Sequence, residues 1–91
     1  MNIILTKDSR KFIEKLGEKN ARQIAIKIKE LSSFGHLNDS KPLKGSKENY
    51  YRTDVGEFRI IYRHQEEDLE ILLVGKRNDN EVYNLFKRKT K

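Results

Sequence analysis

The pattern of apolar and polar positions divides the chain into a helical first half and a strand-rich second half. A run of three apolar residues within 2–5 predicts a first strand. Apolar residues then recur at helical spacing in two stretches. They are Phe12, Ile13 and Leu16 in the first stretch, and Ala21, Ile24, Ile28 and Leu31 in the second. Because positions three, four and seven apart share one face of an α-helix, each stretch predicts an amphipathic helix.

Residues that satisfy free backbone groups mark the ends of these two helices. Thr6 or Asp8 is expected to cap the first helix by accepting a bond from a free N–H, and Gly17 is expected to end it. Asn20 is expected to cap the second helix, which closes at 32–35. The two helices are therefore predicted to form a hairpin laid over a sheet.

A polar loop is predicted at 35–47, and beyond it the apolar period changes from helical spacing to alternation. Alternating positions point to opposite faces of a strand, so this change marks the start of the sheet. In order, the predicted segments are a strand at 51–55, a tight turn at 56–57, a strand at 58–63, a charged turn at 66–68 and a last strand at 69–74.

A third, short helix is predicted at the C-terminus. Val82, Leu85 and Phe86 are its apolar anchors, and Asn78 or Asp79 is expected to cap it. The element order is β-α-α-β-β-β-α, and strands joined by short turns must run antiparallel. The predicted fold class is α+β, with two N-terminal helices packed on a mainly antiparallel sheet of about four strands. The residues expected to be buried include Ile24, Ile28, Leu31, Ile60, Leu72 and Val74.

The composition limits the classes of protein that the chain can represent. Its 91 residues make a single domain, 1–91, and the hydrophobic fraction of 35% is enough for one core. The absence of cysteine excludes disulfides and thiolate metal sites. No apolar run approaches the length of a membrane span and no signal-peptide pattern is present, so a cytoplasmic protein without a membrane partner is expected. A formal charge of +6 indicates a polyanionic partner, with a merely soluble basic surface as the plainer alternative.

Two arginines and a tyrosine are the candidate chemical groups. Arg59, Arg77 and Tyr83 are expected on one face of the sheet, in a basic setting that suits chemistry on a phosphodiester. Guanidinium groups hold phosphate oxygens through two bonds and keep their charge, and a phenol can stack on a base or exchange a proton. No metal or other cofactor is expected, since His36 and His64 share no motif. Further cations expected to contact RNA are Lys44, Arg52 and Lys76.

Each of the three candidate residues also has an ordinary structural explanation. Arg59 could pair with Glu70 across a hairpin as a surface ion pair, and such pairs contribute little to stability. Arg77 could belong to a solvated strand end, and Tyr83 could simply pack against the sheet. Their joint occurrence in one ordered pattern is what favours a functional interpretation.

That pattern consists of five short motifs. They are Lys41-Pro42-Leu43-Lys44-Gly45, Tyr51-Arg52, Val55-Gly56-Glu57-Phe58-Arg59-Ile60-Ile61-Tyr62, Val74-Gly75-Lys76-Arg77 and Glu81-Val82-Tyr83. The ordered set resembles the RelE/ParE superfamily of bacterial toxins over nearly the whole chain, and the RelE branch fits better than the ParE branch. The resemblance implies a RelE-like fold and an endoribonuclease that cuts messenger RNA, usually in the ribosomal A site, and that a cognate antitoxin holds inactive. It also implies Arg59, Arg77 and Tyr83 as the catalytic residues.

A metal-independent ribonuclease can use the 2′-hydroxyl of its own substrate. A base removes the proton, the oxygen attacks the adjacent phosphorus and the 5′-oxygen leaves, while arginines stabilise the growing negative charge. In this mechanism Arg59 clamps the phosphate, Arg77 stabilises the transition state and Tyr83 stacks on a base or transfers a proton. Because no residue of this site has an ordinary pKa suited to a general base near neutrality, cleavage is expected to depend on the ribosome to orient the message.

Asp54 departs from the pattern of the RelE branch. Some members carry two basic residues on the second strand, whereas here Arg52 fills the first position and Asp54 the second. A carboxylate would repel phosphate unless it is bonded to a neighbouring arginine, and it could itself act as the base. Asp54 therefore favours two alternatives: a ParE-like toxin that inhibits DNA gyrase without cleaving RNA, and a basic binding module that keeps only the fold.

Overall fold

The computed structural model describes residues 1–43, 49–78 and 81–89. The strands are β1 (Asn2–Leu5), β2 (Lys41–Pro42), β3 (Tyr51–Val55), β4 (Phe58–Gln65) and β5 (Asp68–Lys76). The helices are α1 (Lys7–Glu14), α2 (Glu18–Phe34) and α3 (Glu81–Lys89). Within this described part, no helix has both the length and the apolar character needed to span a membrane.

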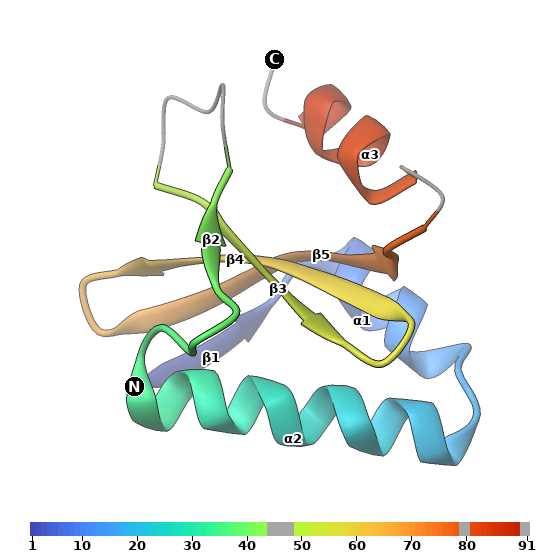
Figure 1. The fold of residues 1–91 in the computed structure, drawn as a ribbon, viewed down its shortest axis with the longest axis horizontal. Coiled ribbons are helices and arrows are strands. Elements are labelled where there is room, and N and C mark those ends of the chain that lie inside the picture. Colours follow the sequence, from blue (N-terminus) through green and yellow to red (C-terminus); the bar gives the residue numbers. More distant parts are fainter. Residues whose placement is uncertain (44–48, 79–80, 90–91) are drawn as a thin grey trace.

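One five-stranded sheet organises the fold, with the strand order β1-β5-β4-β3-β2 (Figure 1). β3, β4 and β5 form an antiparallel meander, as their short connections require. Gly56 makes the first of these turns with a φ of +57°, a left-handed conformation that glycine adopts without steric cost. β1 pairs with β5 in parallel, and β2 extends the opposite edge. The predicted α+β class is confirmed, with one strand more than expected because β2 forms within the predicted polar loop.

Helices cover both faces of the sheet. In Figure 1, α2 lies below the sheet and α3 lies above it. On the face of α1 and α2, the fully buried Ile24 packs in one cluster with Ile60 of β4. On the other face, Val82 and Phe86 of α3 pack with Ile61, the next residue of β4. β4 is therefore buried on both sides, and all six residues predicted to be buried are buried.

Some helix ends differ from the prediction. Thr6 caps α1, and its hydroxyl accepts a hydrogen bond from the backbone N–H of Ser9 at 3.2 Å. Gly17 does not end α1, which stops at Glu14. It precedes α2 instead, in the extended conformation that starts a helix. Asn20 consequently lies inside α2, so its predicted capping role is wrong.

The other boundaries lie close to their predicted positions. The charged turn is shorter than expected: Glu66 turns the chain with a φ of +57°, and Asp68 already begins β5. Asp79, a predicted cap of α3, lies outside the described residues, as does the side chain of Leu85. The segments on either side of the turn confirm the strand predictions.

Candidate functional site

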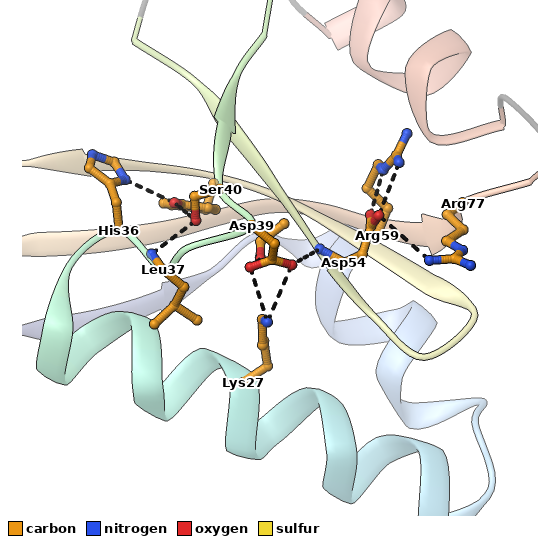
Figure 2. A network of polar contacts seen from close by, with 10 residues as sticks. Lys27, His36, Leu37, Asp39, Ser40, Asp54, Arg59 and Arg77 are labelled. Carbon is orange, nitrogen blue, oxygen red and sulfur yellow. Dashed lines mark hydrogen bonds and ion pairs between the residues drawn. The ribbon is translucent and has the colours of Figure 1, made fainter.

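Asp54 and Arg59 face each other across the hairpin of β3 and β4. They are opposite each other in the antiparallel register, and opposed residues point to the same face of a sheet. Arg59 donates from Nε to Asp54 Oδ1 at 2.7 Å and from Nη2 to Oδ2 at 3.2 Å (Figure 2). Both carboxylate oxygens are engaged, so the guanidinium is held by a two-bond fork.

Arg77 brings a second guanidinium to the same carboxylate. It follows the last residue of β5, and its backbone N–H donates to the carbonyl of Glu57 at 3.0 Å, which ties the end of β5 to the turn between β3 and β4. Arg77 Nη1 lies 3.7 Å from Asp54 Oδ2. The Arg77 side chain is 46% exposed and that of Arg59 only 15%, so a ligand from solvent meets Arg77 first.

Tyr83 reaches this group from α3. Arg59 Nη1 donates a hydrogen bond to the Tyr83 hydroxyl, and the guanidinium carbon lies 5.4 Å from the ring centroid. The neighbouring Val82 is fully buried and anchors α3 on the sheet. A Cβ placed on Gly75 would lie 3.1 Å from Val82 Cβ, so the missing side chain of this glycine lets α3 approach closely enough. We call Asp54, Arg59, Arg77 and Tyr83 the Asp54 cluster.

The charges of the Asp54 cluster hold each other in their ionised forms. The hydrogen bond from Arg59 lowers the pKa of Asp54 against the opposing effect of partial burial, and the positive charges of Arg59, Arg52 and Arg77 lower it further. The hydrogen bond to Asp54 in turn raises the pKa of Arg59. Asp54 is therefore negative at neutral pH and neutralises part of the positive charge of the two arginines it touches.

The cations predicted to contact RNA are not all beside this cluster. Arg52 lies two residues before Asp54 on β3 and hence on the same face, near enough for its charge to lower the pKa of that carboxyl. Lys76 is exposed at the end of β5, opposite Phe58, whose side chain packs on the face of α1 and α2. Because opposed residues share a face, Lys76 lies off the face of the Asp54 cluster. Lys44 lies outside the described residues.

The alternative ion pair between Arg59 and Glu70 does not form. Glu70 lies opposite Arg63, whose Nε donates to Glu70 Oε1 at 2.9 Å. Arg63 stands four residues beyond Arg59 on β4, so each arginine pairs with the carboxylate that the strand register sets opposite to it. Arg59 does form an ion pair across a hairpin, but with Asp54 and not with Glu70.

Asp39 supports the Asp54 cluster by holding the backbone of β3, and it was not singled out from the sequence. Its carboxylate accepts a hydrogen bond from the hydroxyl of Thr53 at 2.7 Å. It also accepts hydrogen bonds from the backbone N–H of Asp54 at 3.0 Å and from Lys27 Nζ at 3.3 Å (Figure 2). Through Asp39, these bonds connect Thr53 and the backbone of Asp54 on β3 to Lys27 on α2. No local motif marks Asp39, because even Lys27, the closest in sequence of these three partners, is 12 residues away along the chain.

The two histidines lie elsewhere. Their rings are 5.1 Å apart on the face of α1 and α2, where His36 Nδ1 lies 2.9 Å from the hydroxyl of Tyr62. In residues 1–43, 49–78 and 81–89, no three side chains of His, Cys, Asp or Glu are grouped to hold a metal ion. The side chains of the Asp54 cluster provide two guanidinium groups, a carboxylate and a phenol.

Known proteins share this fold. The family model for the ParE toxin of type II toxin-antitoxin system, parDE, matches residues 3–81. A mutant of the Escherichia coli toxin RelE in the free state is 21% identical, with a TM-score of 0.79 over 99% of this chain and 97% of that one. The RelB–RelE antitoxin–toxin complex from Methanococcus jannaschii is 26% identical, with a TM-score of 0.69 over 91% and 98%. The YoeB/ParE toxin from Agrobacterium tumefaciens is 22% identical, with a TM-score of 0.69 over 85% and 99%. A comparison with curated protein sequences gives no match.

Proposed function

Since the chain belongs to the ParE toxin family of type II toxin–antitoxin systems, within the RelE/ParE superfamily, we propose that this toxin is an endoribonuclease that cleaves messenger RNA on the ribosome. A cognate antitoxin is its protein partner and holds it inactive. The reaction is metal-independent and uses the 2′-hydroxyl of the substrate as the nucleophile.

The observation that supports this proposal is the convergence of Arg59, Arg77 and Tyr83. They come from β4, from the residue after β5 and from α3. Nevertheless both guanidinium groups approach the carboxylate of Asp54, and the hydroxyl of Tyr83 is bonded to Arg59. Two arginines that converge on one anion are also what binding of a phosphodiester requires. An accidental basic surface would not bring a tyrosine hydroxyl from a separate helix onto one of these arginines.

In the proposed reaction the 2′-hydroxyl gives its proton to a base and its oxygen attacks the adjacent phosphorus. The bond from phosphorus to the 5′-oxygen breaks, and this leaving oxygen takes up a proton. The products carry a 2′,3′-cyclic phosphate and a 5′-hydroxyl. Negative charge grows on the non-bridging oxygens, and Arg59 and Arg77 stabilise it more strongly in the transition state than in the ground state. Tyr83, held by Arg59, stacks on a base next to the scissile phosphate or carries a proton.

The ribosome contributes the geometry that this site lacks. In-line attack requires the 2′-oxygen, the phosphorus and the leaving oxygen to be aligned, and such alignment is worth several kcal/mol of barrier. A message gripped by the ribosome is already oriented, whereas free RNA samples many conformations. Ribosome dependence therefore follows from a site that stabilises charge but presents no dedicated base.

Asp54 supports a second candidate function. Its carboxylate bonds to Arg59 and lies beside Arg77, so the positive charge available to a phosphate is smaller than in a site with a basic residue at this position. A non-nuclease toxin that inhibits DNA gyrase, as proposed for ParE-like proteins, would tolerate this arrangement. An assay of DNA supercoiling by purified gyrase distinguishes the two functions. A gyrase inhibitor should block supercoiling, whereas a ribonuclease should leave it unchanged.

We propose an acidic, partly disordered antitoxin as the partner. The chain carries a charge of +6, which speeds encounter with an acidic protein, and a flexible segment can cover a large surface. The relative from Methanococcus jannaschii was solved as an antitoxin–toxin complex. The antitoxin either covers the Asp54 cluster or displaces α3 and removes Tyr83 from Arg59.

Alanine substitutions test the ribonuclease proposal. Arg59→Ala and Arg77→Ala should each lower the rate of cleavage on translating ribosomes by about 10²–10³-fold, the usual cost of one preorganised charge donor. Arg22→Ala is the matched control, because this arginine is exposed on α2 and bonds Glu18, one helical turn away, at 3.0 Å. Cut sites are mapped on translated messages and growth inhibition is scored at equal expression. Unchanged toxicity and cut sites in both site variants would defeat the proposal.

A further inference from the structure

The carboxylate of Asp54 stands where a phosphate would have to bind. Arg59 reaches it with two hydrogen bonds, at 2.7 and 3.2 Å, and Arg77 approaches the second oxygen at 3.7 Å. A phosphodiester also presents two oxygens of one negative charge, and a guanidinium fork holds them in the way it holds a carboxylate. Carboxylate and phosphate therefore compete for the same donors.

We propose that Asp54 is an internal competitor of RNA: it occupies the arginine pair in the free toxin and must be displaced by the scissile phosphate, so that only firmly presented RNA is bound. This inference rests on the proposed ribonuclease function, and it identifies Asp54 as a specificity-determining residue of that site. For free RNA in solution, displacement of the carboxylate lowers the affinity directly. A message held by the ribosome presents its phosphate at a high local concentration, which offsets this loss.

The structure provides a route for the exchange. The outer contact, between Asp54 and Arg77, is the longer one, and Arg77 is the more exposed of the two arginines. An incoming phosphate meets Arg77 first and then competes for Arg59. Arg52, two residues away on the same face, offers the displaced carboxylate another cation.

The backbone of β3 does not need to move during this exchange. Asp39 holds the N–H of Asp54 at 3.0 Å and the hydroxyl of the fully buried Thr53 at 2.7 Å. The strand is thus fixed to α2 through Lys27, and displacement is a rotation of the Asp54 side chain alone. Rotation of a partly exposed side chain is fast, so the carboxylate can act as a competitor without slowing the encounter.

The test compares two variants, each of which removes the negative charge of a carboxylate that is bonded to an arginine. Asp54→Asn keeps the shape of the side chain and removes its charge. Glu70→Gln is the control, because Glu70 of β5 is bonded to Arg63 of β4 at 2.9 Å and its side chain is 24% exposed, against 27% for Asp54. The probe is a 2′-O-methyl oligoribonucleotide, which cannot be cleaved by attack of its 2′-oxygen, and its binding is measured by fluorescence anisotropy.

Asp54→Asn should bind the probe about tenfold more tightly than Glu70→Gln, since a hydrogen-bonded charge pair no longer has to be broken. In the double variant Asp54→Asn with Arg59→Ala, the gain should disappear, because the released donor is gone. Equal affinities of the two single variants, or a gain that persists in the double variant, would overturn the proposal. Asp54→Ser repeats the measurement if the asparagine variant does not fold.

A cleavage assay separates this role from that of a general base. On translating ribosomes, Asp54→Asn should cut at a rate no lower than that of Glu70→Gln, whereas loss of a base would lower the rate by about 10²-fold or more. Such a loss would overturn the internal-competitor role. If the unmodified toxin cuts nothing, the ribonuclease proposal fails while the binding comparison still decides whether Asp54 competes with RNA.

Discussion

Replacing Gly75 with alanine tests how α3 holds Tyr83 against Arg59. Gly75 lies on β5 directly opposite Arg59, and the added Cβ would stand 3.1 Å from Val82 Cβ. Carbon atoms in comfortable contact are about 3.5–4.0 Å apart, so Val82 has to retreat by a few tenths of an ångström. Because Val82 is part of α3, the helix moves with it and the bond between Arg59 and Tyr83 is stretched.

The size of the effect follows from the packing. Overfilling a buried contact costs about 1–3 kcal/mol. A chain of 91 residues has a free energy of unfolding of about 5–14 kcal/mol, at roughly 0.05–0.15 kcal/mol per residue, so the variant should remain folded. We expect Gly75→Ala to lower the free energy of unfolding by about 1–2 kcal/mol and to lower toxicity more than this loss of stability alone would.

Urea unfolding and growth inhibition, measured on the same variants, are the assays. Gly17→Ala is the control, because no atom lies within 4 Å of the Cβ that it would add and its φ of −62° suits any residue. Val82→Gly removes the Cβ that stands 3.1 Å from the added atom, and it should cost about 3 kcal/mol by itself, from the lost apolar side chain and from a glycine inside α3. In the double variant of Gly75→Ala and Val82→Gly the clash is relieved, so it should be more stable than the sum of the two single effects by about 1 kcal/mol. Effects that add within about 0.5 kcal/mol would refute the close-contact explanation.

Three further predictions concern the phenol, the carboxylates and the substrate. Tyr83→Phe keeps the ring and loses the hydroxyl: single-turnover rates close to those of the unmodified toxin would assign Tyr83 to stacking, and a loss of about 10²-fold to proton transfer. The free energy of unfolding should fall as the pH drops from about 5 to 3. The bond from Arg59 lowers the pKa of Asp54 below its ordinary value of 3.8. The pKa of Asp39 is lowered as well, because the bonds from Thr53, the N–H of Asp54 and Lys27 outweigh the effect of partial burial. Both carboxylates therefore bind protons more readily in the unfolded chain. Urea unfolding at both pH values checks this, and a variant with asparagine at both positions should show a smaller fall. Purified toxin should cut messages on ribosomes quickly and naked messenger RNA slowly, and rapid cutting of naked RNA in the same buffer would contradict the orientation argument.

Features that depend on neighbouring residues could be read from the sequence. The apolar stripe of α2 and the alternation in β3 and β4 are set by the geometry of a single helix or strand, and residues such as Ile24 and Ile60 are buried as their positions predict. The boundary between the first two helices could not be placed in this way, because a glycine such as the one in the connection at 15–17 is found at either end of a helix. Gly17 starts α2 where it was expected to end α1.

The ion pairs of the candidate site could not be read in this way. Spacing along β4 shows that Arg59 and Arg63 share a face, but which carboxylate each one meets depends on how β3 and β5 are aligned with β4. That alignment is a consequence of packing the whole core, and a slip of one residue would move every side chain of a strand to the other face. Asp54 therefore became the partner of Arg59, and Glu70 that of Arg63, only in the folded sheet.

From the sequence alone came every element except β2, most of the core and the choice of the arginines and tyrosine of the candidate site. The tertiary structure decided that Tyr83 meets Arg59 through the contact of α3 with Gly75, that Lys76 lies on the other face, and that Asp39 secures β3. Each of these depends on contacts between residues far apart in the chain. Local spacing selects a face within one element, whereas strand register and helix docking select the partners, because they are set by the burial of all the apolar faces at once.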